Sequence, residues 1–257
     1  MVKVLFSDHD FPDIELELEL FRRHGIGVEV AQCRTEDEVI AAAKGCYGIL
    51  VQYAPITDRV LAALPEVGIV SRLGAGYDTI DTDACARHGV WVANSPDYGV
   101  GEVATHALGL ALAVSRNLVA YHRDIAAGTW HYESSGKLRR PHGMTLGIVG
   151  LGRIGKRMAQ ISRDVFGRVV AYDPYLIDGD FPVFVERVHS LDALARVADV
   201  ASLHTPLTKE TRGMIGAGFF AAMQHGSYLV NTARGAVVDV PALLAALDAG
   251  QVAAAGL

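Results

Sequence analysis

Short apolar runs alternate with segments of helical spacing along the first part of the chain. The apolar runs predict strands at residues 2–7, 27–33, 48–52, 68–73 and 90–93. The segments between them carry apolar residues on one helical face and predict helices at residues 14–23, 36–43, 58–64 and 82–87. Strands buried on both faces read as continuous apolar runs, and their alternation with helices is typical of a parallel sheet covered by helices.

The same alternation resumes at Thr145. The predicted strands are residues 146–149, 168–172, 200–203 and 228–231, with helices at 156–165, 191–197 and 218–223. Pro241 opens a last helix over residues 242–249, and Gly250 follows it at the position where glycine ends helices. Residues 252–257 predict a final strand, whose abrupt stop indicates that this second sheet is incomplete.

A long apolar segment between the two series predicts one connecting helix. Residues 102–126 contain no proline and one internal glycine, Gly109. Residues 128–143 are polar and aromatic and predict an irregular excursion. We therefore expect an α/β protein of two Rossmann-like or flavodoxin-like lobes with parallel sheets, residues 1–97 and 98–257, joined by a long helix.

Composition excludes several classes of protein. Hydrophobic residues make up 51% of the chain and charged residues 20%, which supplies a substantial core and argues against disorder. The formal net charge of −6 argues against a nucleic-acid-binding surface. The small basic cluster of Lys137, Arg139 and Arg140 is interpreted as a solvated loop. The longest apolar stretch, residues 107–114, is too short to cross a bilayer.

The cysteines bear on the compartment of the protein. Cys33, Cys46 and Cys85 have no metal-ligand spacing and leave an odd thiol, so they are interpreted as small buried or semi-buried residues in a reducing cytosol. After Lys3 only a short apolar run precedes Asp8, which is not the pattern of a secretory signal. We expect a cytoplasmic protein with no metal site and no membrane partner.

A glycine-rich turn follows the strand that starts at Thr145. Its sequence is Gly150-Leu151-Gly152-Arg153-Ile154-Gly155. Between a strand and a helix, such glycines let the chain turn, let a pyrophosphate approach the backbone, and let helix and strand pack closely. The free N–H groups and the dipole at the start of the helix favour an anion. The alternative is an ordinary glycine turn in an α/β unit.

An acidic residue at a particular spacing favours the dinucleotide site. Asp173 follows the next predicted strand and lies 21 positions after Gly152. A carboxylate there accepts hydrogen bonds from the ribose 2′-OH and repels a 2′-phosphate, which favours NAD over NADP. Pro174 and Tyr175 add no positive charge to reverse that preference. The residues assigned to this site are Gly150, Gly152, Arg153, Ile154, Gly155 and Asp173.

Five segments carry a resemblance to a known family. They are residues 71–78, the glycine turn with residues 172–174, and residues 204–208, 226–235 and 252–257. In this order and spacing they closely resemble the D-isomer-specific 2-hydroxyacid dehydrogenases. That family includes phosphoglycerate, glycerate and hydroxypyruvate enzymes and the C-terminal-binding-protein corepressors. Residues 172–176 lean toward the corepressor-like branch and its bacterial relatives.

The resemblance implies an NAD-dependent oxidoreductase that interconverts a small D-2-hydroxy acid and its 2-oxo acid. It assigns Arg234 to the substrate carboxylate and to the carbonyl oxygen that becomes anionic as hydride arrives. It assigns Gly74, Ala75 and Gly76 to the substrate carboxylate through backbone N–H groups. The residues that it places around the cofactor are His204, Thr205, Pro206, Thr232, Ala233 and Arg234. The simpler alternatives are a surface ion pair for Arg234 and a plain turn for the glycine loop.

The chain departs from the family pattern in its proton-transfer residues. By resemblance, His204 lies on the cofactor side, and the catalytic histidine and its partner glutamate come from segments beyond Leu257. Residues 1–257 alone are therefore expected to bind NAD but to turn over slowly. The alternative function is a non-catalytic, NAD(H)-responsive binding protein resembling the corepressors. Thr105 stands where relatives often carry an acidic residue, and nothing in the sequence explains the effect of this difference.

The resemblance also implies partners. The segments predicted to connect the lobes carry large apolar and aromatic side chains, among them Leu118, Tyr121, Trp130 and Tyr132. Exposed together they exceed what a monomer usually presents to water, and relatives dimerise through the equivalent region, so we expect a homodimer. The small-molecule partner is a 2-hydroxy or 2-oxo acid, whose side chain is expected to contact residues 53–55.

Overall fold

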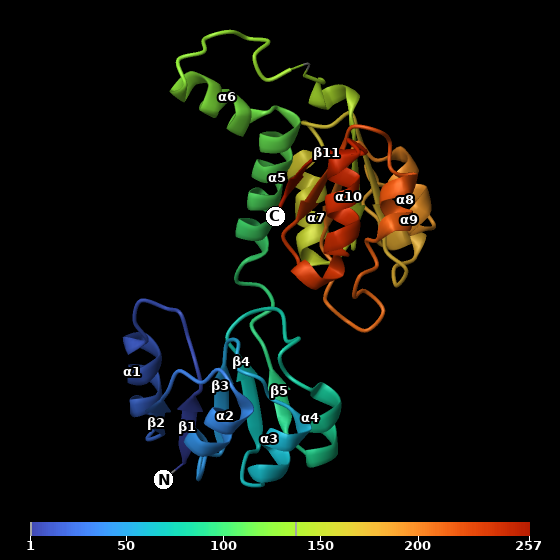
Figure 1. Cartoon of the computed structure of the whole chain (residues 1–257). Coiled ribbons are helices and arrows are strands. Elements are labelled where there is room, and N and C mark those ends of the chain that lie inside the picture. The colour runs from blue at the N-terminus through green and yellow to red at the C-terminus, as the bar shows by residue number, and fades with distance from the viewer. Residues whose placement is uncertain (1, 137) are drawn as a thin grey trace. The chain divides into compact units, whose positions relative to one another are not determined.

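The chain forms two compact units, Met1–Tyr98 and Gly99–Leu257, in a computed structural model that describes residues 2–136 and 138–257. Each unit is built on one sheet of parallel strands with helices packed against it (Figure 1). The predicted α/β class is therefore confirmed.

The first unit contains a five-stranded sheet in the order β2-β1-β3-β4-β5. Its strands are β1 (Lys3–Phe6), β2 (Gly27–Val30), β3 (Gly48–Val51), β4 (Ile69–Arg72) and β5 (Trp91–Ala93). Its helices are α1 (Glu15–Arg23), α2 (Glu36–Ala42), α3 (Asp58–Ala63) and α4 (Thr82–His88). This is the flavodoxin-like order, in which the strand sequence reverses direction between β1 and β3.

Side-chain caps begin the helices that enclose the main core of the first unit. Thr35, Thr57 and Asp81 each accept a hydrogen bond from a backbone N–H in the first turn of α2, α3 and α4. These helices bury apolar side chains such as Val39 and Val60 against β3 and β4. The caps explain why the helices begin within a residue or so of the predicted positions.

The second unit contains a six-stranded sheet in the order β11-β10-β9-β6-β7-β8. Its strands are β6 (Thr145–Val149), β7 (Arg168–Tyr172), β8 (Glu186–Arg187), β9 (Val200–Leu203), β10 (Ser227–Asn231) and β11 (Val252–Gly256). Its later helices are α7 (Arg153–Ser162), α8 (Leu191–Val197), α9 (Ala217–Ala222) and α10 (Val240–Asp248). This is the Rossmann order, which reverses between β6 and β9. The sequence did not predict β8, which is an edge strand of two residues.

Helices cover both faces of the second sheet. Helix α5 (Val100–Ser115) and α7 lie on one face, and α8, α9 and α10 lie on the other (Figure 1). The small buried residues Ala104, Ala107 and Ala111 let α5 approach the strands closely. A Cβ added to Gly256 on β11 would lie 2.9 Å from the Cβ of Leu110. The final strand is thus an integral part of this core.

The prediction of one long connecting helix is wrong. The segment forms two helices, α5 and α6 (Leu118–Ala126), which meet at a bend of 61°. Asn117 adopts a left-handed conformation with φ 51°, and its side-chain amide donates to the carbonyl of Ser135 at 2.7 Å. Asparagine tolerates this conformation, and its contact with a distant segment fixes the break. Among the described residues no single helix is long and apolar enough to span a membrane, and only this bent pair together meets that length and composition.

The predicted excursion after α6 is largely irregular and ends in a short 3₁₀ turn, η1 (Pro141–Gly143). Arg139 forms an ion pair at 2.5 Å with Asp199, whose side chain is 6% exposed. Arg139 therefore anchors the excursion to the start of β9. For this residue, the interpretation as part of a solvated loop is wrong. Lys137, which was assigned to the same loop, lies outside the described residues.

Candidate functional site

The glycine turn of the second unit lies at the carboxyl end of β6, beside the reversal of strand order. Gly150 has φ +89°, and a Cβ added there would lie 2.8 Å from the side-chain methyl group of Thr205. A Cβ added to Gly155 would lie 2.1 Å from the carbonyl oxygen of Gly150. Helix α7 therefore packs against the turn as closely as the fingerprint predicts, and side chains are excluded at both positions.

Gly152 leaves the start of α7 open. It is the N-cap residue of the helix, provides no side-chain cap, and a Cβ added there meets no described atom within 4 Å. The first turn of α7 therefore presents N–H groups, such as those of Ile154 and Gly155, that no cap side chain satisfies. This geometry is the one that binds a pyrophosphate.

The carboxylate of Asp173 closes the same edge of the sheet. Oδ2 accepts the backbone N–H of Leu151 at 2.9 Å, and Oδ1 accepts that of Tyr175 at 2.9 Å. Each carboxylate oxygen has a further lone pair for a ligand hydroxyl. Asp173 thus ties the glycine turn to β7 and presents the anionic acceptor that suits a ribose 2′-OH.

Buried hydroxyl groups at this edge have no hydrogen-bond partner among the described residues. They are Thr205 Oγ1, which follows β9, and Thr232 Oγ1, which follows β10. An unpaired buried hydroxyl costs about 1–3 kcal/mol, which a polar ligand would recover. The open helix start, Asp173 and these hydroxyls fit a dinucleotide, and they fit NAD in particular because the acid opposes a 2′-phosphate.

His204 lies at the end of β9, next to Thr205. Its Nε2 is 2.9 Å from the hydroxyl of Ser202. Burial lowers the pKa of His204 to about 4, so the imidazole is neutral at pH 7. A histidine acts as a general acid in its protonated, imidazolium form, which His204 does not hold at pH 7. This favours the predicted place of His204 beside the cofactor.

Asn231 fixes the loop that carries Arg234. Its amide nitrogen donates to the carbonyl of Arg234 at 3.0 Å, and its amide oxygen accepts the N–H of Ala233 at 3.0 Å. The Arg234 guanidinium donates to the carbonyl of Ala233 at 2.9 Å. The sequence did not predict a role for Asn231, although an amide side chain at the end of an apolar strand, three residues before an arginine, was the available signal.

The remaining predicted residues of the second unit share this edge. Arg153 and Ile154 open α7, Pro206 follows Thr205, and Ala233 precedes Arg234. The carboxyl ends of β6, β7, β9 and β10 thus bring together every residue assigned to the cofactor. In the residues that the structure describes, no cluster of three or more histidine, cysteine or acidic side chains is arranged to hold a metal.

The predicted substrate loop lies in the first unit, after β4. Gly74 has φ +147°, and a Cβ added there would lie 1.5 Å from Nη1 of Arg72. The side-chain amide of Asn94 donates to the carbonyl of Ala75 at 2.8 Å, and the N–H of Ser95 donates to that of Gly74 at 3.0 Å. The exit of β5 therefore holds the Gly74–Gly76 loop in shape, a role of Asn94 that the sequence did not predict.

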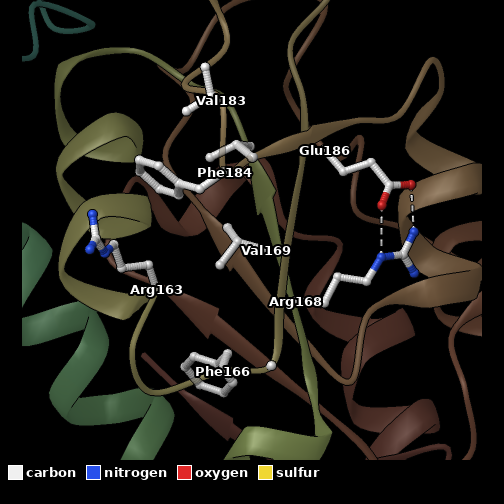
Figure 2. Close-up of a pocket in the computed structure, with 9 residues that line it drawn as sticks. Arg163, Phe166, Arg168, Val169, Val183, Phe184 and Glu186 are labelled. Carbon is white, nitrogen blue, oxygen red and sulfur yellow. Dashed lines mark hydrogen bonds and ion pairs between the residues drawn. The ribbon is translucent and has the colours of Figure 1, made fainter.

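A hollow of about 520 Å³ lies at the other edge of the second sheet, near the amino end of β7. Figure 2 shows Arg168 and Glu186 joined by two hydrogen bonds, of 2.9 and 2.6 Å, on one side of it. On the other side Arg163 lies 5.8 Å from the ring centre of Phe184. No described residue lining it has a buried unpaired polar atom, so the hollow carries no sign of a ligand.

Comparison with known proteins places the second unit in a family. The model of the family described as D-isomer specific 2-hydroxyacid dehydrogenase, NAD binding domain, matches residues 108–257, which is more than half of the chain. The chain belongs to this family. The glycine turn, Asp173 and the two unpaired threonine hydroxyls all lie in the matched segment, and NAD is the cofactor that they fit.

Members of the family with known names or structures are similar over most of the chain. The D-3-phosphoglycerate dehydrogenase of Mycobacterium tuberculosis is 41% identical over 86% of this chain and 42% of its own length. That of Archaeoglobus fulgidus is 34% identical over 100% of this chain and 48% of its own length. A D-lactate dehydrogenase from Aquifex aeolicus, solved with NAD and lactic acid, has a TM-score of 0.89 and 30% identity over 99% of this chain and 76% of its own. The chain thus spans less than half the length of the curated relatives.

Proposed function

We propose that the protein is an NAD-dependent oxidoreductase that interconverts a small D-2-hydroxy acid and its 2-oxo acid. Family membership and the names of the similar dehydrogenases support this proposal. The observation that carries it is Arg234, a half-buried arginine held by Asn231 at the same sheet edge as the cofactor residues. A cation fixed there suits a substrate that is an anion and gains further charge in the reaction.

The chain's own residues divide the work. NAD, when bound, supplies or accepts hydride at its nicotinamide ring. Arg234 binds the substrate carboxylate and stabilises the negative charge that develops on the carbonyl oxygen. The Gly74–Gly76 loop offers backbone N–H groups to the carboxylate. Asp173 selects the ribose, while neutral His204 adds no charge beside the cofactor.

The test measures NADH oxidation by the protein expressed from its complete reading frame, with glyoxylate, pyruvate and hydroxypyruvate. Arg234→Gln is expected to lower kcat/KM by about 10²–10³, because it removes the charge that stabilises the transition state. NAD affinity, measured by calorimetry, is expected to fall far less than kcat/KM. Arg157→Gln removes an exposed arginine of α7 and serves as the matched control. NAD binding with no turnover of any acid would instead favour the NAD(H)-responsive binding protein.

We also propose a cytoplasmic homodimer. Leu118, Val119 and Ile125 on α6 and Trp130 and Tyr132 beyond it are more than half exposed, a concentration of apolar surface that supports an interface. The cysteines are free and buried, as suits a reducing compartment. Light scattering at micromolar concentration is expected to give the mass of a dimer, and cell fractionation to recover the protein with the cytoplasm. A monomeric mass would reject the dimer.

A further inference from the structure

A row of polar residues crosses the carboxyl edge of the first sheet. Asp8 and Asp10 follow β1, Gln52 and Tyr53 follow β3, and Arg72 ends β4. Strands β1, β3 and β4 are neighbours, and the strand order reverses between the first two, which is where ligands bind in open α/β sheets. Neighbouring strands lie about 4.8 Å apart, so the row spans about 10 Å.

Asp8 fills the anion site that the backbone forms at this reversal. It is 4% exposed. Its carboxylate accepts the backbone N–H groups of Gln52 at 3.2 Å, Tyr53 at 2.5 Å and Ala54 at 3.3 Å. Successive N–H groups of this kind bind phosphates in other folds. Because the protein's own carboxylate satisfies them, these N–H groups are not available to a phosphate on a substrate.

Asp10 adds a second, exposed carboxylate at the β1 end of the row, opposite Arg72. Gln52 Nε2 donates to its Oδ1 at 2.5 Å, and the Tyr53 hydroxyl donates to its Oδ2 at 2.9 Å. The hydrogen bond from Gln52, and after it the one from Tyr53, lowers the pKa of the Asp10 carboxyl below its usual value. The sequence predicts that Tyr53 contacts the substrate side chain. The ionised carboxylate of Asp10 therefore lies next to that predicted contact.

The positive charge lies at the other end of the row. Arg72 is the one lysine or arginine in segments 7–10, 51–57 and 71–80, all of which the structure describes. Its guanidinium lies against Gly74 and donates to the carbonyl of Leu73 at 3.1 Å. Its Nε is buried and unpaired. The Arg72 cation thus lies at the glycine loop, which is predicted to bind the substrate carboxylate. The Asp10 anion lies farther along the row, beside Gln52 and Tyr53.

We propose that Asp10, held by Tyr53 and Gln52, makes the protein select 2-oxo acids with an uncharged tail over acids with a phosphorylated tail. The inference rests on the proposed dehydrogenase function. A substrate held by its carboxylate at the glycine loop extends its tail along the row toward Tyr53. A phosphate ester, with a charge of about −1.5 to −2 at pH 7, meets a like charge there. A tail ending in a methyl or hydroxyl group meets none.

The experiment compares kcat/KM for hydroxypyruvate and 3-phosphohydroxypyruvate, with NADH and the protein from its complete reading frame. The unphosphorylated acid is expected to be preferred by about 10²-fold, as like-charge contacts cost several kcal/mol. Asp10→Asn is expected to reduce that preference about tenfold by raising kcat/KM for the phosphorylated acid. Glu66→Gln removes an equal charge at the amino edge of the same sheet, where Glu66 accepts the N–H of Gly45 at 2.8 Å, and is expected to leave the preference unchanged.

Two further arms separate charge from shape and folding. In about 1 M salt the Debye length falls to about 3 Å, and the preference is expected to narrow in the wild type but not in Asp10→Asn. Tyr53→Lys changes a side chain that is 55% exposed and places a cation beside Asp10, so it is expected to raise kcat/KM for the phosphorylated acid even if Asp10→Asn folds poorly.

Different failures have different meanings. Equal or better use of the phosphorylated acid by the wild type, or equal effects of Asp10→Asn and Glu66→Gln, overturns the selectivity and leaves the dehydrogenase function standing. A folded protein that binds NAD but oxidises NADH with none of glyoxylate, pyruvate, hydroxypyruvate and 3-phosphohydroxypyruvate overturns the proposed function, and this inference with it.

Discussion

The two units use the same kind of sheet and treat its reversal point in opposite ways. In the first unit Asp8 is the second residue after β1, and its carboxylate accepts hydrogen bonds from the N–H groups of Gln52, Tyr53 and Ala54. In the second unit the first strand runs into glycines, and Gly152 leaves the start of α7 open. In the first unit the protein's own carboxylate satisfies the backbone N–H groups at the reversal point. In the second unit the glycine turn leaves them open to a ligand.

Strand order predicts where a ligand can bind in such a sheet but not whether one does. Both sheets have the reversal at which ligands bind in such folds. What differs is whether the backbone donors there already have an acceptor.

Removing the internal anion should damage the first unit most. Asp8→Ala leaves three N–H groups without their acceptor, and at about 1–3 kcal/mol for each buried unpaired group we expect a loss of at least about 3 kcal/mol in the free energy of unfolding. Urea denaturation measures this loss. Asp8→Asn keeps one acceptor oxygen and should cost less. A loss below about 1 kcal/mol for Asp8→Ala would show that water replaces the carboxylate and would break the comparison.

A pair of glycine variants should separate packing from binding in the second unit. Gly155→Ala pushes a Cβ to within 2.1 Å of a backbone oxygen, so we expect a stability loss of about 1–3 kcal/mol and poor NAD binding. Gly152→Ala meets no neighbour within 4 Å, so the melting temperature should hold while NAD affinity falls. Thermal melts and calorimetry measure the two effects. Equal melting temperatures for both variants would contradict the close packing of α7 on the turn.

Asp173→Ala should weaken NAD binding about tenfold and reduce the discrimination against NADP, because it removes the ribose acceptor and the charge that opposes a 2′-phosphate. The variant also leaves the N–H of Leu151 without its acceptor, so a modest fall in melting temperature should accompany it. Asp192→Asn, at an exposed position on α8, is a control. Unchanged affinities for both dinucleotides would refute the role of Asp173.

The smallest effect should come from His204. Its pKa is lowered from 6.5 to about 4, so the unfolded chain binds the proton more readily than the folded one. The stability that neutral His204 contributes is therefore complete above about pH 7 and is lost as the pH falls through 6.5 toward 4. By linkage we expect about 0.7 kcal/mol less stability at pH 6 than at pH 7, a difference that His204→Asn should abolish in denaturant titrations at the two pH values. The same pH slope in that variant would assign it to other groups.

The pattern of apolar residues predicted most of both sheets because buried parallel strands are marked locally. Strands β7 and β9 have the predicted bounds, and the glycine turn and Asp173 meet as their spacing implies. The failures lie where a distant contact decides. Asn117 breaks the long helix through a hydrogen bond to Ser135, and no periodicity in residues 102–126 records that contact.

The site was predicted in the same uneven way. Residues whose type matches a local requirement, such as Gly150 and Gly155, were found from the sequence. Asp8, Asn94 and Asn231 act by hydrogen bonds to the backbone of loops, and in isolation each is an ordinary polar residue at or just after the end of a strand. Their roles depend on which loop folds beside them, which a single sequence does not reveal.

Amide hydrogen exchange with and without saturating NAD tests the difference between the two reversal points most directly. The amides of Gln52, Tyr53 and Ala54, already bonded to Asp8, should exchange slowly in both states. The amides of Ile154 and Gly155, at the uncapped start of α7, should exchange quickly without NAD and slow by at least about tenfold with it. Slowing at residues 52–54 on adding NAD, or none at residues 154–155, would contradict the assignment of the two edges.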